Sequence, residues 1–105
     1  VLYESHCADC HQAQGQGVAR AYPPLAGNPS VQAPYPINAI RMVLSGGFPP
    51  STPGNPRPYG MPPFSQDLSD REVAAILTFV RGAWGNQAPA VAPAEVAKAR
   101  GLPAL

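Results

Sequence analysis

The stretch Cys7-Ala8-Asp9-Cys10-His11 decides what this chain folds around. Two thiols three residues apart on one helical turn can each reach one vinyl group of the same porphyrin. The histidine that follows then lies beneath the ring with a nitrogen facing the iron. The pentad therefore predicts one covalently attached haem c, with Cys7 and Cys10 as thioether links and His11 as the proximal iron ligand.

Other uses of a Cys-x-x-Cys pair fit the rest of the sequence less well. A thioredoxin-like pair needs a βαβ context, but residues 12–36 are rich in Gly, Pro and Ala and show no strand pattern. A structural zinc site needs a second pair of ligands, and an iron–sulfur cluster needs about four thiolates, whereas the sequence offers two cysteines and, besides His11, only His6. A disulfide between the two thiols would close too small a loop to stabilise much. A non-haem dithiol or structural domain stays open as a further function class.

The opposite iron ligand is sought among two methionines. Met61 lies in Gly60-Met61-Pro62-Pro63-Phe64. The prolines there stiffen the chain and remove two backbone donors, and the glycine lets the main chain approach a flat cofactor. Met42 lies off the apolar stripe of a predicted helix, which is typical of a gap-filling or partly exposed side chain. Because of these local geometries we expect Met61 rather than Met42 to be the ligand. A histidine–methionine pair is an arrangement that raises the haem potential.

Several short motifs follow the pentad in a recognisable order. They are Gly15-x-Gly17, Tyr22-Pro23-Pro24-Leu25-Ala26-Gly27, Gly60-Met61-Pro62-Pro63-Phe64 and Leu68-Ser69-Asp70-x-Glu72-Val73. Together they resemble a class I, mitochondrial-type cytochrome c of the bacterial kind over about residues 1–86. The stretch from Met61 to Asn86 is especially similar to the haem domains of bacterial dehydrogenase cytochrome subunits and of haem-fused copper nitrite reductases.

This resemblance implies a small all-α cytochrome c fold, with about three main helices and long Pro/Gly-rich loops wrapped around one covalent haem. It implies that a proline carbonyl, for which we choose Pro24, accepts the free N–H of His11 and so fixes the orientation of the ring. Haem c in this family is attached outside the bacterial cytoplasm, so we expect a periplasmic chain, either a mature fragment or one domain of a longer protein. The haem domain is expected to cover residues 1–86, and residues 87–105 form a Pro/Ala-rich C-terminal extension.

Three further side chains are candidate haem contacts. Arg57 and Tyr59 lie just before Met61 and could donate to the haem propionates, although a solvated loop arginine is an equal alternative. Trp84 could donate its indole N–H toward the haem edge, but a core or interface anchor is favoured. His6 is expected to lie on the surface.

The helix signals are uneven along the chain. We expect a short helix over about residues 1–10, and a second over 36–45 that Gly46-Gly47 ends. The clearest helix begins at the capping box Ser69-Asp70-Arg71-Glu72, carries an apolar stripe and ends at Gly82. Residues 89–93 are expected to be linker-like, with one helical turn over 96–100. The stripe should pack against Leu2, Tyr3 and the haem edge, and it consists of Val73, Ile76, Leu77 and Val80.

Composition narrows the possible partners. The chain has 105 residues, 15 prolines, 10 glycines and 45% hydrophobic residues, which favours one domain with stiff, ordered loops over disorder. The net charge is +1 and Lys98 is the single lysine, so nothing indicates nucleic-acid binding or steering by a lysine ring. No apolar stretch is long enough to span a membrane. Docking is expected to use an apolar rim at the haem edge made of Cys10, Gln12, Ala13, Pro62 and Pro63.

These features predict a one-electron carrier rather than an enzyme. It would pass electrons between periplasmic redox partners, such as a dehydrogenase or terminal reductase, as a free protein, a subunit or a fused domain. The alternative is a haem peroxidase or gas-binding sensor domain with a labile methionine ligand. The sequence offers no well-placed distal acid or base for that chemistry.

Overall fold

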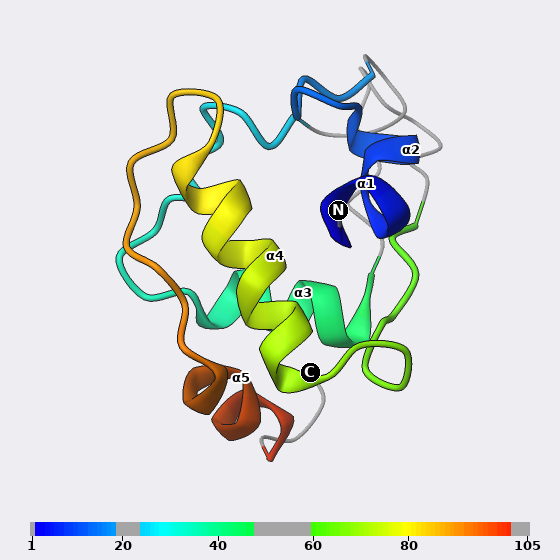
Figure 1. Cartoon of the computed structure of the whole chain (residues 1–105), viewed down its shortest axis with the longest axis vertical. Coiled ribbons are helices and arrows are strands. Elements are labelled where there is room, and N and C mark those ends of the chain that lie inside the picture. The colour runs from blue at the N-terminus through cyan, green and yellow to red at the C-terminus, as the bar shows by residue number, and fades with distance from the viewer. Residues whose placement is uncertain (1, 19–23, 48–59, 102–105) are drawn as a thin grey trace.

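The computed structural model describes residues 2–18, 24–47 and 60–101, and these residues form five helices joined by long connections (Figure 1). The helices are α1 (Leu2–His6), α2 (Ala8–His11), α3 (Ile37–Ser45), α4 (Asp70–Gly82) and α5 (Pro93–Arg100). An isolated antiparallel bridge joins Gly47 and Met61, and no strand is formed within the described ranges. The predicted all-α class is confirmed.

The haem-binding pentad lies at a break between two short helices. The sequence predicted one helix over residues 1–10, but Cys7 leaves the helical conformation at φ −124° and ψ −32°. The break is slight, since the Cys7 N–H donates to the Tyr3 carbonyl at 2.8 Å and the His11 N–H to the Cys7 carbonyl at 3.0 Å. The chain therefore keeps a helical path through both thiols.

Helix α3 begins and ends where its sequence signals place it. Pro36 is the residue before the first helical position, where its missing N–H costs nothing. Gly46 follows the last turn with φ +67° and donates its N–H to the Met42 carbonyl at 2.8 Å. A residue with a positive φ cannot continue the helix, and glycine adopts this conformation without strain.

Helix α4 has the predicted capping box. The Glu72 N–H donates to Ser69 Oγ at 3.1 Å, and the Ser69 N–H donates to Glu72 Oε1 at 2.9 Å. Two N–H groups that the first turn leaves without helical partners are thereby satisfied. The helix runs to Gly82, as predicted.

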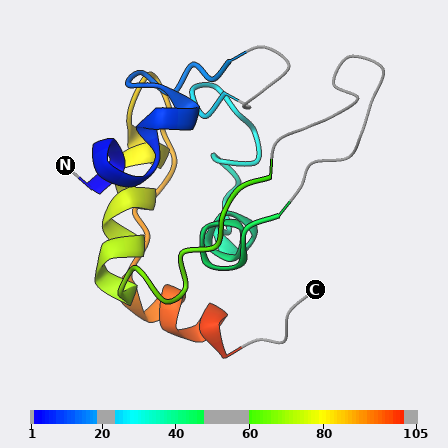
Figure 2. The same cartoon turned by 90° about the vertical axis from the view of Figure 1, so that its right-hand side faces the viewer.

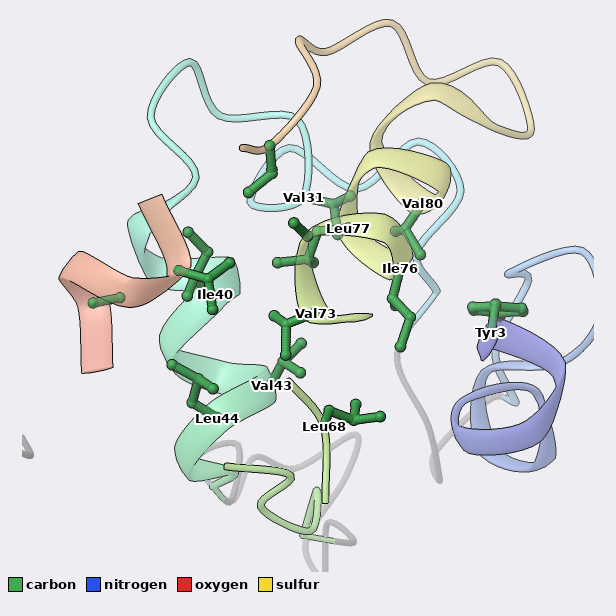
Figure 3. Packing of buried hydrophobic residues seen from close by; sticks show 14 residues of the cluster. Tyr3, Val31, Ile40, Val43, Leu44, Leu68, Val73, Ile76, Leu77 and Val80 are labelled. Carbon is green, nitrogen blue, oxygen red and sulfur yellow. The ribbon is translucent and has the colours of Figure 1, made fainter. Parts of the chain in front are cut away.

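The hydrophobic core lies between α3, α4 and α5 (Figure 3). Val43 of α3 lies beside Val73 of α4, and both are buried, as are Ile40, Leu44 and Leu77. Tyr3 of α1 lies on the side of α4 away from α3 (Figure 3), which agrees with the expected packing of the first helix on the apolar stripe.

Residues 87–101 differ from the linker and single turn that the sequence predicted. Helix α5 has eight residues and packs against both α3 and α4. Val91, Val96 and Ala99 are buried in the core, and Val96 is 0% exposed. The Thr78 hydroxyl donates to the Val91 carbonyl at 3.2 Å and accepts the Val91 N–H at 3.0 Å. This stretch is therefore part of the packed fold, while the domain boundary at residue 86 stays a prediction.

None of the helices in the described ranges is long and apolar enough to cross a membrane.

Candidate haem site

The two thiols and the imidazole of the pentad lie on neighbouring turns at the end of α1 and along α2. Cys7 and Cys10 are unpaired and half-buried, and His11 is 8% exposed. Burial, with a smaller effect of Cys10, raises the pKa of the Cys7 thiol to about 11. Redox-active thiol pairs need the opposite shift, because the thiolate is the reactive form. The environment of Cys7 therefore gives no support to the dithiol alternative.

Tyr3 fixes the position at which α2 ends. Gln12 follows α2 with φ +72°, a conformation that few non-glycine residues adopt. Its N–H donates to the Ala8 carbonyl at 2.8 Å, and its carbonyl accepts the Tyr3 hydroxyl at 2.6 Å. The residue directly after His11 is thereby tied to α1, which orients the whole pentad.

Met61 is fixed by backbone hydrogen bonds on both sides of its α-carbon. Its N–H donates to the Gly47 carbonyl at 2.7 Å, and its carbonyl accepts the Gly47 N–H at 3.1 Å. Gly46 allows this approach, because a Cβ there would collide with the Met61 carbonyl oxygen. The Met61 side chain is half-buried and packs against the apolar core, whereas Met42 is 46% exposed as expected.

Residues 60–68, which we call the methionine segment, pass the C-terminal end of α3, a helix that Figure 2 shows end-on. The Phe64 N–H donates to the Val43 carbonyl at 2.9 Å, and the Ser65 N–H donates to the Leu44 carbonyl at 3.1 Å. The His6 ring meets the Phe64 ring edge-on, with centroids 5.8 Å apart. The expectation of a surface position for His6 is thus wrong: the ring is half-buried because Phe64 covers it, and this contact brings α1 to the methionine segment.

The residues directly after Pro24 are hydrogen-bonded to Gly15, four residues beyond His11. The Leu25 and Ala26 N–H groups donate to the Gly15 carbonyl at 2.7 and 3.0 Å. The Pro24 carbonyl accepts Asn28 Nδ2–H at 2.8 Å. A carbonyl oxygen has two lone pairs, so it retains capacity for a second donor. The His11–Pro24 bond stays a prediction.

Asn86 is a positioning residue that the sequence reasoning did not identify. It is 3% exposed, and its Oδ1 accepts the Gly27 N–H at 2.8 Å. Its Nδ2 donates to the Val80 carbonyl at 2.8 Å and to the Leu25 carbonyl at 3.1 Å. One amide therefore joins the end of α4 to the stretch that follows Pro24. A polar residue after a helix gave no sequence signal for this role, because both loop partners lie about sixty positions earlier.

Trp84 lies in a cluster of three aromatic rings. Its centroid is 5.1 Å from that of Tyr3 and 5.5 Å from that of Phe79, and the Tyr3 and Phe79 centroids are 5.6 Å apart. A Cβ on Gly15 would come within 2.5 Å of the indole ring, so glycine is required there. The cluster agrees with the anchor interpretation of Trp84, and its role as a haem contact stays a prediction. Arg57 and Tyr59 lie outside the described residues.

Arg81 is a second buried residue whose role was missed. Its side chain is 0% exposed, with Nε donating to the Pro89 carbonyl at 2.9 Å and Nη1 to the Val31 carbonyl at 3.4 Å. The signal was present, since Arg81 falls eight residues after Val73 and therefore on the apolar stripe of α4. The guanidinium holds two irregular stretches on the end of α4.

The comparisons with known proteins agree with this geometry. The cytochrome c family model matches residues 1–84, the range that holds the pentad, Met61 and the capped helix α4. This chain belongs to the cytochrome c family. The resemblance noted from the motifs is therefore confirmed, and so is covalently bound haem c as the cofactor of this cytochrome c.

Two of the similar proteins are subunits of bacterial dehydrogenases. The chain is 41% identical over 99 residues to "Alcohol dehydrogenase (quinone), cytochrome c subunit" of Gluconacetobacter polyoxogenes, covering 93% of this chain and 21% of that protein. It is 38% identical to the "Gluconate 2-dehydrogenase cytochrome c subunit" of Pantoea cypripedii, covering 90% and 22%. The chain thus spans about a fifth of the length of these relatives. Cytochrome c-552 of Thermus thermophilus is 35% identical, covering 78% of this chain and 65% of that protein. These relationships make this cytochrome c an electron-transfer haem domain.

The chemistry of the donor set fits haem c. Two unpaired, half-buried thiols can form the thioether links, and the buried His11 imidazole can bind iron from one side. The Met61 side chain is half-buried, and the methionine segment that carries it reaches α1 through the His6–Phe64 contact. No three His, Cys, Asp or Glu side chains gather into a metal site anywhere in the described ranges, so the geometry there does not offer the alternative zinc site.

Proposed function

We propose that this cytochrome c domain is a one-electron carrier whose iron is bound by His11 on one face and Met61 on the other. Haem c supplies a couple between ferric and ferrous iron. His11 and Met61 each come from a segment that the fold holds rigidly. Two protein ligands leave substrates and gases no free position, and this favours electron transfer over peroxidase or sensor chemistry.

The fixed position of Met61 is the observation that carries this proposal. Both of its backbone groups bond to Gly47, and the chain after it is bonded to α3 through Phe64 and Ser65. A ligand held in this way stays in place in both oxidation states, so little reorganises when an electron moves. Met42 is also held by helical hydrogen bonds, but its side chain is 46% exposed and is not held against the core.

Substitution of Met61 tests the ligand assignment. In haem-loaded Met61→Ala we expect the far-red band of methionine-bound ferric haem to disappear, the reduction potential to fall and the reduced protein to bind carbon monoxide. Met42→Ala is the matched control and should leave all three properties unchanged. Carbon monoxide binding by the unaltered reduced protein would instead favour the sensor alternative. A retained band in Met61→Ala would move the assignment away from this residue.

The proposed partner is the catalytic component of a dehydrogenase in the bacterial periplasm, which the names of the dehydrogenase relatives support. The carrier would not itself be the enzyme. Around the attachment site, Ala13, Pro62 and Pro63 are exposed, and Cys10 and Gln12 are partly exposed. None of these five residues is charged and only Gln12 is strongly polar, so they suit an apolar docking rim.

The salt dependence of electron transfer tests this docking mode. Because the rim lacks a cluster of charges, the second-order rate with the catalytic partner should change little as ionic strength rises. Electrostatically steered association falls steeply under the same conditions. A steep fall in rate with added salt would contradict apolar docking.

A further inference from the structure

The C-terminal helix α5 reaches the methionine segment through one side chain, Arg100. Figure 2 shows the methionine segment descending past α3 and turning above α5 before α4 begins. At that turn, Arg100 Nη1 donates to the Ser65 carbonyl at 2.6 Å and Nη2 donates to the Leu68 carbonyl at 2.5 Å. Arg100 Nε donates to Asp70 Oδ1 in the first turn of α4. One guanidinium therefore binds three points within six residues of chain.

These bonds complete a series of attachments along the segment that carries Met61. The Gly47 pairing holds the segment at Met61, and the last carbonyls of α3 hold it at Phe64 and Ser65. The Phe64 carbonyl also accepts the Leu68 N–H at 3.0 Å, closing a turn. The Arg100 guanidinium then fixes the two carbonyls that face outward from this turn. Hydrogen bonds from a cation are about twice as strong as neutral ones.

Helix α5 is itself firmly placed, which makes Arg100 an effective anchor. Val96 and Ala99 of α5 are buried against α3 and α4, and 28% of the Arg100 side chain is exposed. The ion pair with Asp70 also orients the guanidinium, because it leaves both terminal nitrogens facing the turn. An arginine supplies several donors in one plane, which a lysine cannot do.

We propose that Arg100 is a positioning residue for the Met61 ligand, an inference that rests on the proposed ligation of iron by Met61. By holding the turn at Ser65 and Leu68, Arg100 restricts how far the methionine segment can move. The bond between a thioether and ferric iron is weak, so the ligand stays bound only while its segment is kept near the metal. The extension beyond the haem-binding core thus controls how easily the methionine leaves.

Competition with imidazole on the haem-loaded full chain measures this effect. Imidazole displaces the methionine from ferric haem, and the far-red absorption band reports the displacement. In Arg100→Ala the half-displacing imidazole concentration should fall about tenfold, which corresponds to the loss of one charge-assisted hydrogen bond. Arg100→Lys should lie between Arg100→Ala and the unaltered protein. Lys98→Ala removes the same charge from the same helix at an exposed position and should leave the concentration unchanged.

Val96→Ala separates positioning from general stability. It weakens the packing of α5 but leaves the three hydrogen bonds of Arg100 in place, so its unfolding midpoint should fall while its imidazole sensitivity stays that of the unaltered protein. Equal sensitivity in Val96→Ala and Arg100→Ala would overturn the proposal, and so would an Arg100→Ala protein that resists imidazole normally. If Arg100→Ala fails to fold, Arg100→Lys is used instead: a lower half-displacing imidazole concentration supports the proposal, and an unchanged one overturns it.

Met61→Ala separates this proposal from the proposed function. If the unaltered protein and Met61→Ala have the same far-red spectrum, Met61 ligation is wrong and the role of Arg100 is wrong with it. If the band depends on Met61 but is insensitive to Arg100, the carrier function stands and the positioning role alone is wrong.

Discussion

The hydroxyl of Tyr3 connects the stability of the fold to alkaline pH. Tyr3 is 4% exposed and donates to the carbonyl of Gln12, the residue after the proximal ligand. Burial, with a smaller effect of Cys7, raises the pKa of Tyr3 to about 12 from its ordinary value of 10. Because the folded-state pKa is the higher one, the protonated hydroxyl stabilises the fold fully below pH 10. That contribution is lost as the pH rises toward 12.

Tyr3→Phe should therefore change both the stability and its pH dependence. At pH 7 we expect a loss of about 1 kcal/mol of unfolding free energy, because the bond to the Gln12 carbonyl is gone. Between pH 10 and 12 the variant should lose less stability than the unaltered protein, as measured by urea unfolding. Tyr35→Phe is the matched control, since Tyr35 is 82% exposed. If the unfolding free energy of Tyr3→Phe falls between pH 10 and 12 as steeply as that of the unaltered protein, the loss does not come from ionisation of Tyr3.

Single residues were predictable where their chemistry is local. The cofactor could be predicted from the pentad because haem attachment needs two thiols and an imidazole on neighbouring helical turns, and this spacing is visible in the sequence. Asn86 was missed because its carbonyl partner Leu25 lies about sixty positions earlier. The place of Arg81 on the apolar stripe indicated its burial but not its partner Val31, fifty positions earlier. No local pattern encodes such partners. His6 was misplaced for the same reason, as Phe64 comes from the other half of the chain.

At the scale of single elements, the capping box of α4 makes a measurable contribution. Ser69→Ala removes the oxygen that accepts the Glu72 N–H and should lower the unfolding free energy by about 1 kcal/mol. The hydrogen bonds from Ser69 lower the pKa of the Glu72 carboxyl below its ordinary value. The ionised carboxyl therefore adds stability above pH 4.5 that is lost as the pH falls. Urea unfolding at pH 7 and below pH 4.5 measures both effects, with Ser30→Ala as the control. A Ser69→Ala protein as stable as that control would contradict the prediction.

Helix boundaries could be predicted where the chain carries its own start and stop signals. Pro36 and Gly46 bound α3, and Ser69 and Gly82 bound α4, all by local backbone chemistry. The length of α5 was underestimated because its buried residues, Val96 and Ala99, are small and give a weak periodic pattern. The helix is stabilised by packing on α3 and α4, which the local sequence does not reveal.

At the scale of the whole molecule, the resemblance placed the boundary of the haem domain at residue 86, and removing residues 87–105 tests it. The two buried valines of this stretch, Val91 and Val96, alone represent about 3–6 kcal/mol of burial. We therefore expect the truncated haem protein to unfold at a clearly lower urea concentration, or to fail to fold. The milder variant Val91→Ala should show a smaller shift in the same direction. A truncated protein with the full unfolding midpoint would mean that residues 1–86 form an independent domain.

The overall architecture was predictable because the cofactor imposes it. A chain this small has a limited core of its own, so its helices and stiff loops must be arranged around the porphyrin. The order in which the distant stretches attach to α4 was not predictable, since it depends on the side chains of Arg81, Asn86 and Arg100.

The pair of hydrogen bonds between Gly47 and Met61 has a consequence for protein engineering. Both bonds use main-chain atoms only, so a different side chain at position 61 leaves them in place. A histidine introduced there would therefore offer iron a nitrogen ligand from the same backbone position.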